Sequence, residues 1–177
     1  EQFHELLVEA GTDSAGDAAW DYHSASIDGV YQPLVGDFAG DGADDIFWYA
    51  PGDTTDVLWI AQAGSRGSDS FTRVRFSVVG AYRPVVGDFV GDDYDDILWY
   101  SPGTATDPIW ASTTSEAVFE RVDRLTVDGD YWPEVLRDYR DARKDRIVWQ
   151  RTSKGHDAAW AFDGDGLGGY QSERLEI

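Results

Sequence analysis

Hydrophobic and polar residues alternate along several short stretches of the chain, and this period of two predicts β-strands. In residues 71–80 every second side chain belongs to one set: Thr72, Val74, Phe76 and Val78. Residues 33–38, 45–51 and 56–62 are also rich in β-forming residues and are separated by polar or Pro-Gly turns. No stretch has a sustained helical period with caps, so we expect little helix.

The same four-strand pattern recurs along the chain. The segment YQPLVGDFAGDGADDIFWYAPG begins at Tyr31, and YRPVVGDFVGDDYDDILWYSPG begins 51 residues later at Tyr82. A weaker copy, YWPEVLRDYRDARKDRIVWQRTS, begins at Tyr131. A repeat of about 50 residues that holds four antiparallel strands is typical of one blade of a β-propeller.

A second motif, Asp-x-x-Trp, follows each copy, with its tryptophan 11 residues after the tryptophan of the copy. A further unit of this kind, DAAW, ends at Trp20. Eleven residues before Trp20 lies Glu9, within the segment HELLVEAG. Aligning Trp20 with Trp59 therefore predicts that this segment is the degenerate second strand of an incomplete first repeat.

We thus predict an all-β fold, a β-propeller-like array of four-stranded antiparallel blades with about three and a half repeats of about 50 residues. The predicted units are a partial first blade and three full blades: residues 1–30, 31–80, 81–129 and 130–177. A β-sandwich built from two repeats is the structural alternative. Propellers usually close with about four to eight blades. We therefore expect either that further residues belong to the ring or that another chain completes it through strand pairing.

The amino-acid composition narrows the classes of binding partner. The 177 residues carry a formal net charge of −20, which disfavours nucleic acid and anionic membrane surfaces and favours cations. There is no cysteine, so disulfides and thiolate metal sites are excluded. No apolar run reaches the roughly 18 residues of a membrane span. A chain that begins at Glu1 and lacks methionine indicates a processed or excerpted product.

Each of the first two copies contains a nine-residue acidic loop. The loop DFAGDGADD, residues 37–45, has carboxylates at positions 1, 5, 8 and 9 and glycine at positions 4 and 6. Ca²⁺ prefers hard oxygen ligands around a tight turn, and four carboxylates without a cation repel one another. The pattern predicts a calcium site with carboxylates from positions 1, 5 and 9 and the carbonyl of position 7. The alternative is that these aspartates only form Asx-turns and surface charge.

The loop, its flanking strands and the period together resemble the FG-GAP or VCBS-type repeats of secreted bacterial proteins and integrin α-subunit propellers. Carried over by position, the resemblance implies two calcium sites. Their ligands would be Asp37, Asp41, Asp45 and the Ala43 carbonyl, and Asp88, Asp92, Asp96 and the Tyr94 carbonyl. The third position, Asp or Asn in the family, is Ala39 or Val90 here, so the affinity should be modest.

The third loop departs further from the motif. Asp138 remains, but Ala142 and Arg146 stand at positions 5 and 9 and Arg143 lies between them. We therefore predict no calcium there, with Asp138 pairing with one of the two arginines instead. A second acidic segment, DGDG at residues 163–166, lacks the later carboxylates and predicts a hairpin turn.

Seven of the eight tryptophans fall in register with the repeats, which indicates packing between blades. A row of sugar-stacking platforms is the alternative. Tyr31, Tyr82 and Tyr131 should likewise pack at the entry of each blade. No histidine, serine or cysteine has a recognisable catalytic partner, so we predict no catalytic residues and no enzyme.

Two functions remain open. The resemblance implies a calcium-stabilised module, secreted or displayed at a bacterial cell surface, whose blade loops bind carbohydrate or protein in a lectin- or adhesion-like role. The incomplete blade count instead favours a self-assembling subunit, an oligomer or an extracellular filament, completed by strands of another chain. A non-catalytic part of a secreted hydrolase is the least favoured hypothesis.

Overall fold

The computed structural model describes most of the chain. The described segments are residues 3–12, 14–16, 18–27, 29–52, 55–62, 71–137, 144–152, 158–162 and 170–174. Within them every regular element is a β-strand, so the predicted all-β class is confirmed.

The strands form four antiparallel sheets in chain order. The N-terminal hairpin comprises β1 (Phe3–Thr12) and β2 (Ala18–Ile27). The first sheet comprises β3 (Gln32–Gly36), β4 (Asp45–Tyr49), β5 (Asp56–Ala61) and β6 (Phe71–Phe76). The second sheet comprises β7 (Arg83–Gly87), β8 (Asp96–Tyr100), β9 (Asp107–Ser112) and β10 (Phe119–Leu125). The third sheet comprises β11 (Tyr131–Leu136), β12 (Arg146–Arg151), β13 (Ala158–Phe162) and β14 (Tyr170–Arg174).

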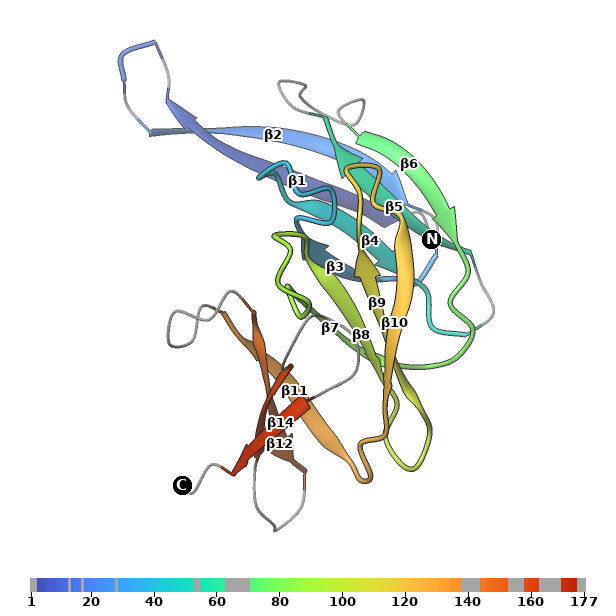
Figure 1. The fold of residues 1–177 in the computed structure, drawn as a ribbon. Helices are drawn as coiled ribbons and strands as arrows, with labels where there is room; N and C mark the ends of the chain where they lie inside the picture. Colours follow the sequence, from blue (N-terminus) through green and yellow to red (C-terminus); the bar gives the residue numbers. More distant parts are fainter. Residues whose placement is uncertain are drawn as a thin grey trace.

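The sheets stand in a row, with the N-terminal hairpin beside the first sheet and the third sheet at the opposite end (Figure 1). The leading strand β7 contacts both β3 and β11, so the three leading strands lie side by side. Four strands per repeat, paired in sequence order, agree with the prediction. The described residues form an open row and do not close into a ring.

The pairing of the N-terminal hairpin corrects the alignment of the first repeat. In β1 and β2, Glu5 pairs with Ala25, two residues before Ile27. In the first sheet Asp56 of the third strand pairs with Phe76, two residues before the buried Val78. The pairing of β1 with β2 thus has the same register as the pairing of β5 with β6. The hairpin therefore supplies the third and fourth strands of its unit. The motif that ends at Trp20 lies at the start of the fourth strand, not in the third as the alignment with Trp59 predicts. The alignment failed because spacing alone does not show which of four similar strands a motif occupies.

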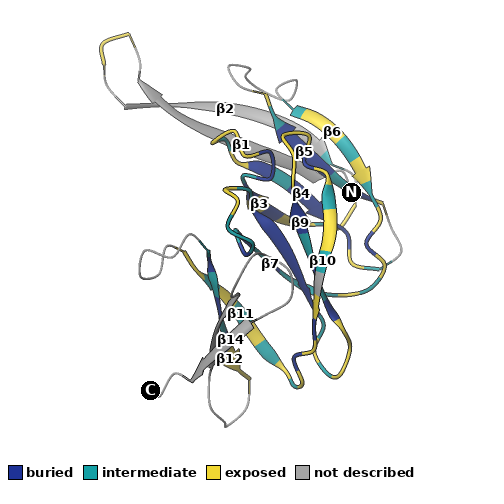
Figure 2. Ribbon diagram, viewed as in Figure 1, coloured by how far each residue is buried: buried dark blue, intermediate teal, exposed yellow. Residues whose placement is uncertain are grey.

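The hydrophobic core lies in layers between neighbouring sheets. One layer joins the first and second sheets, where Trp99 is fully buried and its ring centroid lies 5.0 Å from that of Tyr49. The next layer repeats this contact between Tyr100 and Trp149, at 4.9 Å. Edge-to-face aromatic pairs of this kind add about 1 kcal/mol beyond their buried area. Figure 2 shows that β8 is buried along its length, whereas β6 and β10 are partly exposed.

The aromatic repeats are packing residues where the structure describes them. Four in-register tryptophans are buried: Trp48, Trp59, Trp99 and Trp149. The tyrosine that begins each sheet packs edge-on against one of them, as predicted; the pairs are Tyr31 with Trp48, Tyr82 with Trp99, and Tyr131 with Trp149. These four tryptophans therefore do not form the alternative row of sugar platforms. The side chains of Trp20 and Trp160 lie outside the described residues.

Candidate functional site

The first aspartate of each acidic loop organises the turn. The Asp37 carboxylate accepts hydrogen bonds from the backbone N–H groups of Asp41 and Gly42, at 3.0 and 2.8 Å. The Asp88 carboxylate accepts hydrogen bonds from three N–H groups in the second loop, which are those of Gly91, Asp92 and Asp93. Both aspartates therefore hold the loop backbone in its bent form.

The aspartate at position 5 makes a smaller turn of its own. Asp41 accepts the N–H of Ala43 at 2.9 Å, and Asp92 accepts the N–H of Tyr94 at 3.2 Å. These are Asx-turns, so that alternative describes part of what the loop carboxylates do. The next residue adopts the left-handed conformation in both loops, with φ 84° at Gly42 and φ 68° at Asp93. Glycine is favoured there because it has no Cβ to clash.

The aspartate at position 9 lies inside the protein. Asp45 is fully buried and accepts the N–H groups of Ala39 and Ala61, at 3.0 and 2.8 Å. Its carboxylate therefore joins the loop to the end of the third strand, β5. Burial raises the pKa of Asp45 to about 6, and the charges of Asp41 and Asp37 contribute to that increase.

Asp96 repeats this arrangement in the second loop with one further donor. Its carboxylate accepts the N–H groups of Phe89 and Val90 on one oxygen, at 2.7 and 3.0 Å, and that of Ser112 on the other, at 3.2 Å. Burial raises the pKa of Asp96 to about 8, while these N–H donors oppose the increase and nearby charges add to it. The aspartate that ends each loop is thus a structural link between strands.

The aspartate at position 8 is buried in the second and third copies and exposed in the first. Asp95 and Asp145 are buried at the boundary between two sheets, whereas Asp44 is exposed. Asp95 accepts the N–H of Asp37 from the sheet before it. The sequence pattern left position 8 out of the predicted ligands but did not predict its contact with the preceding sheet.

These loops have the oxygen ligands that Ca²⁺ prefers, and the charges of the other two predicted ligands of each loop contribute to the raised pKa of Asp45 and of Asp96. In the described residues, however, no three acidic or histidine side chains are arranged to hold a metal ion. The carboxylates are turned toward backbone N–H donors instead. Each carboxylate oxygen has two lone pairs, so the chemistry of the donor set fits a hard cation, but ligation requires side chains such as Asp45 to reorient.

The third loop lies largely outside the described residues, including Asp138, Ala142 and Arg143, and so does the segment 163–166. Arg146 is described, and it pairs with Leu136 in the register that Asp96 takes opposite Gly87. The buried carboxylate of the other two copies is therefore replaced by a guanidinium group in this one.

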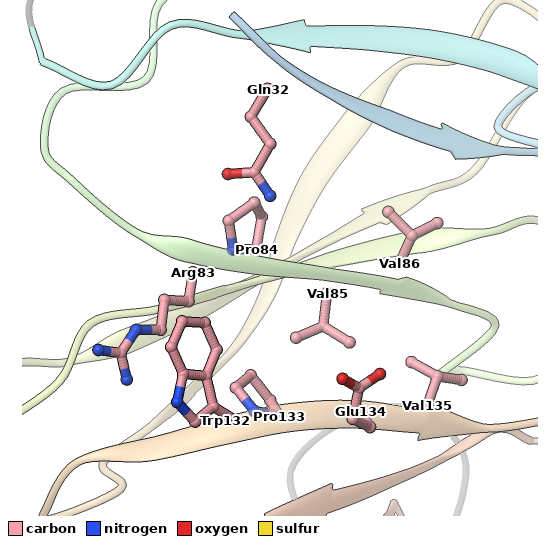
Figure 3. Close-up of a pocket in the computed structure, with 9 residues that line it drawn as sticks. All are labelled: Gln32, Arg83, Pro84, Val85, Val86, Trp132, Pro133, Glu134 and Val135. Atoms are coloured by element: carbon pink, nitrogen blue, oxygen red, sulfur yellow. The ribbon is translucent and has the colours of Figure 1, made fainter. Parts of the chain in front are cut away.

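A second candidate site runs along the leading strands of the sheets. A groove of about 590 Å³ lies between β7 and β11 and reaches β3. Figure 3 shows its labelled side chains. The lining residues are Gln32, Arg83, Pro84, Val85, Val86, Trp132, Pro133, Glu134 and Val135.

Trp132 is the aromatic residue among those that line this groove, and 54% of its surface is accessible. The guanidinium group of Arg83 lies 4.3 Å from its ring centroid, a cation–π contact. Arg83 is itself fixed by an ion pair with Asp130 and by a hydrogen bond to the Tyr131 carbonyl at 2.6 Å. The arrangement gives a fixed aromatic surface beside the exposed carboxylate of Glu134.

The repeat pattern of the sequence does not indicate this groove. Gln32, Arg83 and Trp132 are the middle residues of the three Tyr-x-Pro motifs, and all three line it. Two features of the sequence could have indicated the groove. The middle residue of the Tyr-x-Pro motif differs in chemistry between otherwise similar repeats, and Trp132 is the tryptophan outside the repeat register.

Comparison with known proteins gives no relative: no family model, no curated protein and no solved structure matches the chain. The resemblance to FG-GAP or VCBS repeats therefore stays a prediction from the loop motif. Within the described residues there is also no helix that could cross a membrane.

Proposed function

We propose that this chain is a binding module of the β-propeller type that takes a carbohydrate ligand in the groove between β7 and β11. The observation that carries the proposal is Trp132, a large aromatic ring that lines the groove and is more than half exposed. Aromatic rings offer an apolar face to the C–H face of a sugar, and flanking polar groups hydrogen-bond to its hydroxyls. Arg83, Gln32 and Glu134 supply such groups.

The proposal predicts that Trp132→Ala abolishes saccharide binding, because the stacking surface is lost. Binding of neutral oligosaccharides, such as cello-, chito- and malto-oligosaccharides, would be followed by tryptophan fluorescence and by amide chemical shifts. We expect Trp132→Tyr to retain part of the affinity. Val79→Ala, at an exposed position that does not line the groove, should leave binding unchanged. No binding of any saccharide to the folded protein, or equal binding by Trp132→Ala, would contradict the proposal; binding of a peptide ligand in the groove would favour the protein-binding alternative.

We further propose that Ca²⁺ stabilises the two acidic loops. Support comes from the composition of each loop and from the mutual repulsion of carboxylates that a cation would relieve. Extracellular modules bind Ca²⁺ with dissociation constants of about 10⁻⁴ to 10⁻³ M. The extracellular location and the absence of catalysis remain predictions.

Calorimetric titration should therefore show two calcium equivalents, and a chelator should lower the melting temperature. Asp41→Ala and Asp92→Ala should each remove one equivalent, because each deletes an exposed ligand of one loop. At about 100 times the dissociation constant, each site would add roughly 2.7 kcal/mol of stability. Asp138→Ala is the matched control and should leave the stoichiometry at two. Titration without heat, or a third equivalent that Asp138→Ala removes, would contradict the assignment.

A further inference from the structure

Neighbouring sheets are joined by a reciprocal pair of hydrogen bonds that occurs twice. Between the first and second sheets, the N–H of Asp95 donates to the Asp37 carbonyl at 2.9 Å, and the N–H of Asp37 donates to the Asp95 carboxylate at 3.0 Å. Between the second and third sheets, Asp145 and Asp88 make the same two bonds, at 2.7 and 3.1 Å. We call this arrangement the sheet joint. In one bond the N–H at loop position 1 donates to the carboxylate at position 8, and in the other the N–H at position 8 donates to the carbonyl at position 1.

The sheet joint requires glycine at the end of the leading strand. A Cβ at Gly36 would lie 2.6 Å from the Asp95 carboxylate and 2.6 Å from a methyl group of Val86. A Cβ at Gly87 would lie 2.9 Å from the Asp145 carboxylate. Real side chains do not approach this closely, so the residue before the donor aspartate must be glycine for the next sheet to dock.

The third sheet lacks this requirement. Leu136 pairs with Arg146 in the register in which Gly87 pairs with Asp96, so leucine stands where the first two sheets have glycine. By analogy with Gly36 and Gly87, a Cβ at this position would clash with the carboxylate of a following sheet. The third sheet therefore lacks the glycine that the sheet joint requires.

The first sheet has the complementary half of the joint. Asp44 occupies the position of Asp95 and Asp145, yet it is exposed and has no hydrogen-bond partner among the described residues. On the same side of the row, β1 pairs only with β2 in the described part of the chain. In the complete sheets the strand in the position of β1 pairs on its other edge with a second strand, as β5 pairs with β4. The free edge of β1 and the Asp44 carboxylate, which accepts no hydrogen bond from the described residues, thus lie on the same side of the row.

We propose that this side of the molecule is a docking surface for a β-hairpin of the same repeat type, whose leading strand ends in Val-Gly-Asp. Its second strand would pair with the free edge of β1, and its aspartate N–H would bond to Asp44. A second copy of this chain does not fit, because its Gly36 and Gly87 are already within joints and its third sheet has Leu136. This inference is independent of the groove and of calcium.

The test is a chain extended at its N-terminus by a copy of residues 31–51, which places the copied hairpin at the natural distance from β1. We expect the amides of β1 to exchange with deuterium at least tenfold more slowly than in the original chain. Replacing the copied Gly36 by leucine, or introducing Asp44→Ala into the extended chain, should remove the gain. Asp44→Ala in the original chain should leave exchange unchanged.

The amides of β8 report in every variant whether the rest of the row is folded. Unchanged β1 exchange in an extended chain with protected β8 amides would overturn the proposal, as would a gain that survives both substitutions. Sedimentation of the original chain tests whether a second copy of the chain docks at this surface instead. A dimer that Asp44→Ala dissociates would show that it does and would overturn the assignment.

Discussion

Asp96→Ala should be among the most destabilising substitutions in the chain, with an expected loss of about 3 kcal/mol in the free energy of unfolding at pH 6. The substitution leaves two buried N–H groups, those of Phe89 and Ser112, and the part-buried N–H of Val90 without their acceptor. An orphaned buried donor costs about 1–3 kcal/mol. Removing a buried charge would offset this loss, but at pH 6 the carboxyl is largely protonated because its pKa is about 8. The loss of hydrogen bonds therefore dominates.

The same carboxyl group should make stability depend on pH. The folded protein holds a proton on Asp96 up to pH about 8, whereas the unfolded chain releases it near 3.8. A raised pKa means that the folded state binds more protons, so stability falls as pH rises from about 4 to about 8. Burial acts in the same direction on Asp45, whose pKa is about 6, and on Asp56 and Asp107.

Urea unfolding followed by tryptophan fluorescence, with chelator present, measures both effects. Asp96→Asn is the matched control, because it keeps an oxygen acceptor and cannot titrate. We expect it to lose less stability than Asp96→Ala and to show a shallower fall in stability between pH 6 and 8. A wild-type protein that becomes more stable over that range would show that Asp96 is ionised in the fold and would contradict this account.

The periodicity of the sequence was sufficient for the strands but not for the position of the first repeat. Alternation in residues 71–80 and the period near 50 residues predicted four strands in each full repeat, as found in the three four-stranded sheets. Aligning Trp20 with Trp59 misplaced the N-terminal hairpin by one strand. Every strand of a blade has the same period of two, so only pairing partners distinguish the third strand from the fourth.

For the candidate sites, too, the sequence pattern predicted the motif but not the tertiary contacts of its residues. The spacing in residues 37–45 identified the acidic loop and singled out Asp37, Asp41 and Asp45 as ligands, but it did not predict which aspartates are buried. The structure separates them, because Asp45 lies inside the sheet while Asp44 is exposed. The partner of Asp95 lies 58 residues away in the previous sheet, a distance over which no local pattern operates. Trp132 escaped notice because it lies outside the repeat that identified the other tryptophans.

The second large effect is expected at the sheet joint. Asp95→Ala removes the acceptor of the Asp37 N–H, which lies at a part-buried boundary between two sheets. It also removes the partner of Arg137, whose guanidinium group lies 3.3 Å from the Asp95 carboxylate. The Arg137 contact contributes little, because that side chain is more than half exposed. We expect a loss of about 1–3 kcal/mol, mostly from the orphaned N–H.

Comparing Asp95→Ala with Asp44→Ala tests most directly the central claim that repeated sheets are held side by side by the position-8 carboxylate. Both substitutions delete the same side chain from the same loop position, and of the two only Asp95 accepts a hydrogen bond from a preceding sheet in the described residues. Urea unfolding at pH 6 should give the loss above for Asp95→Ala and a change within about 0.5 kcal/mol for Asp44→Ala. Equal losses for the two variants, or no loss for Asp95→Ala, would contradict the account.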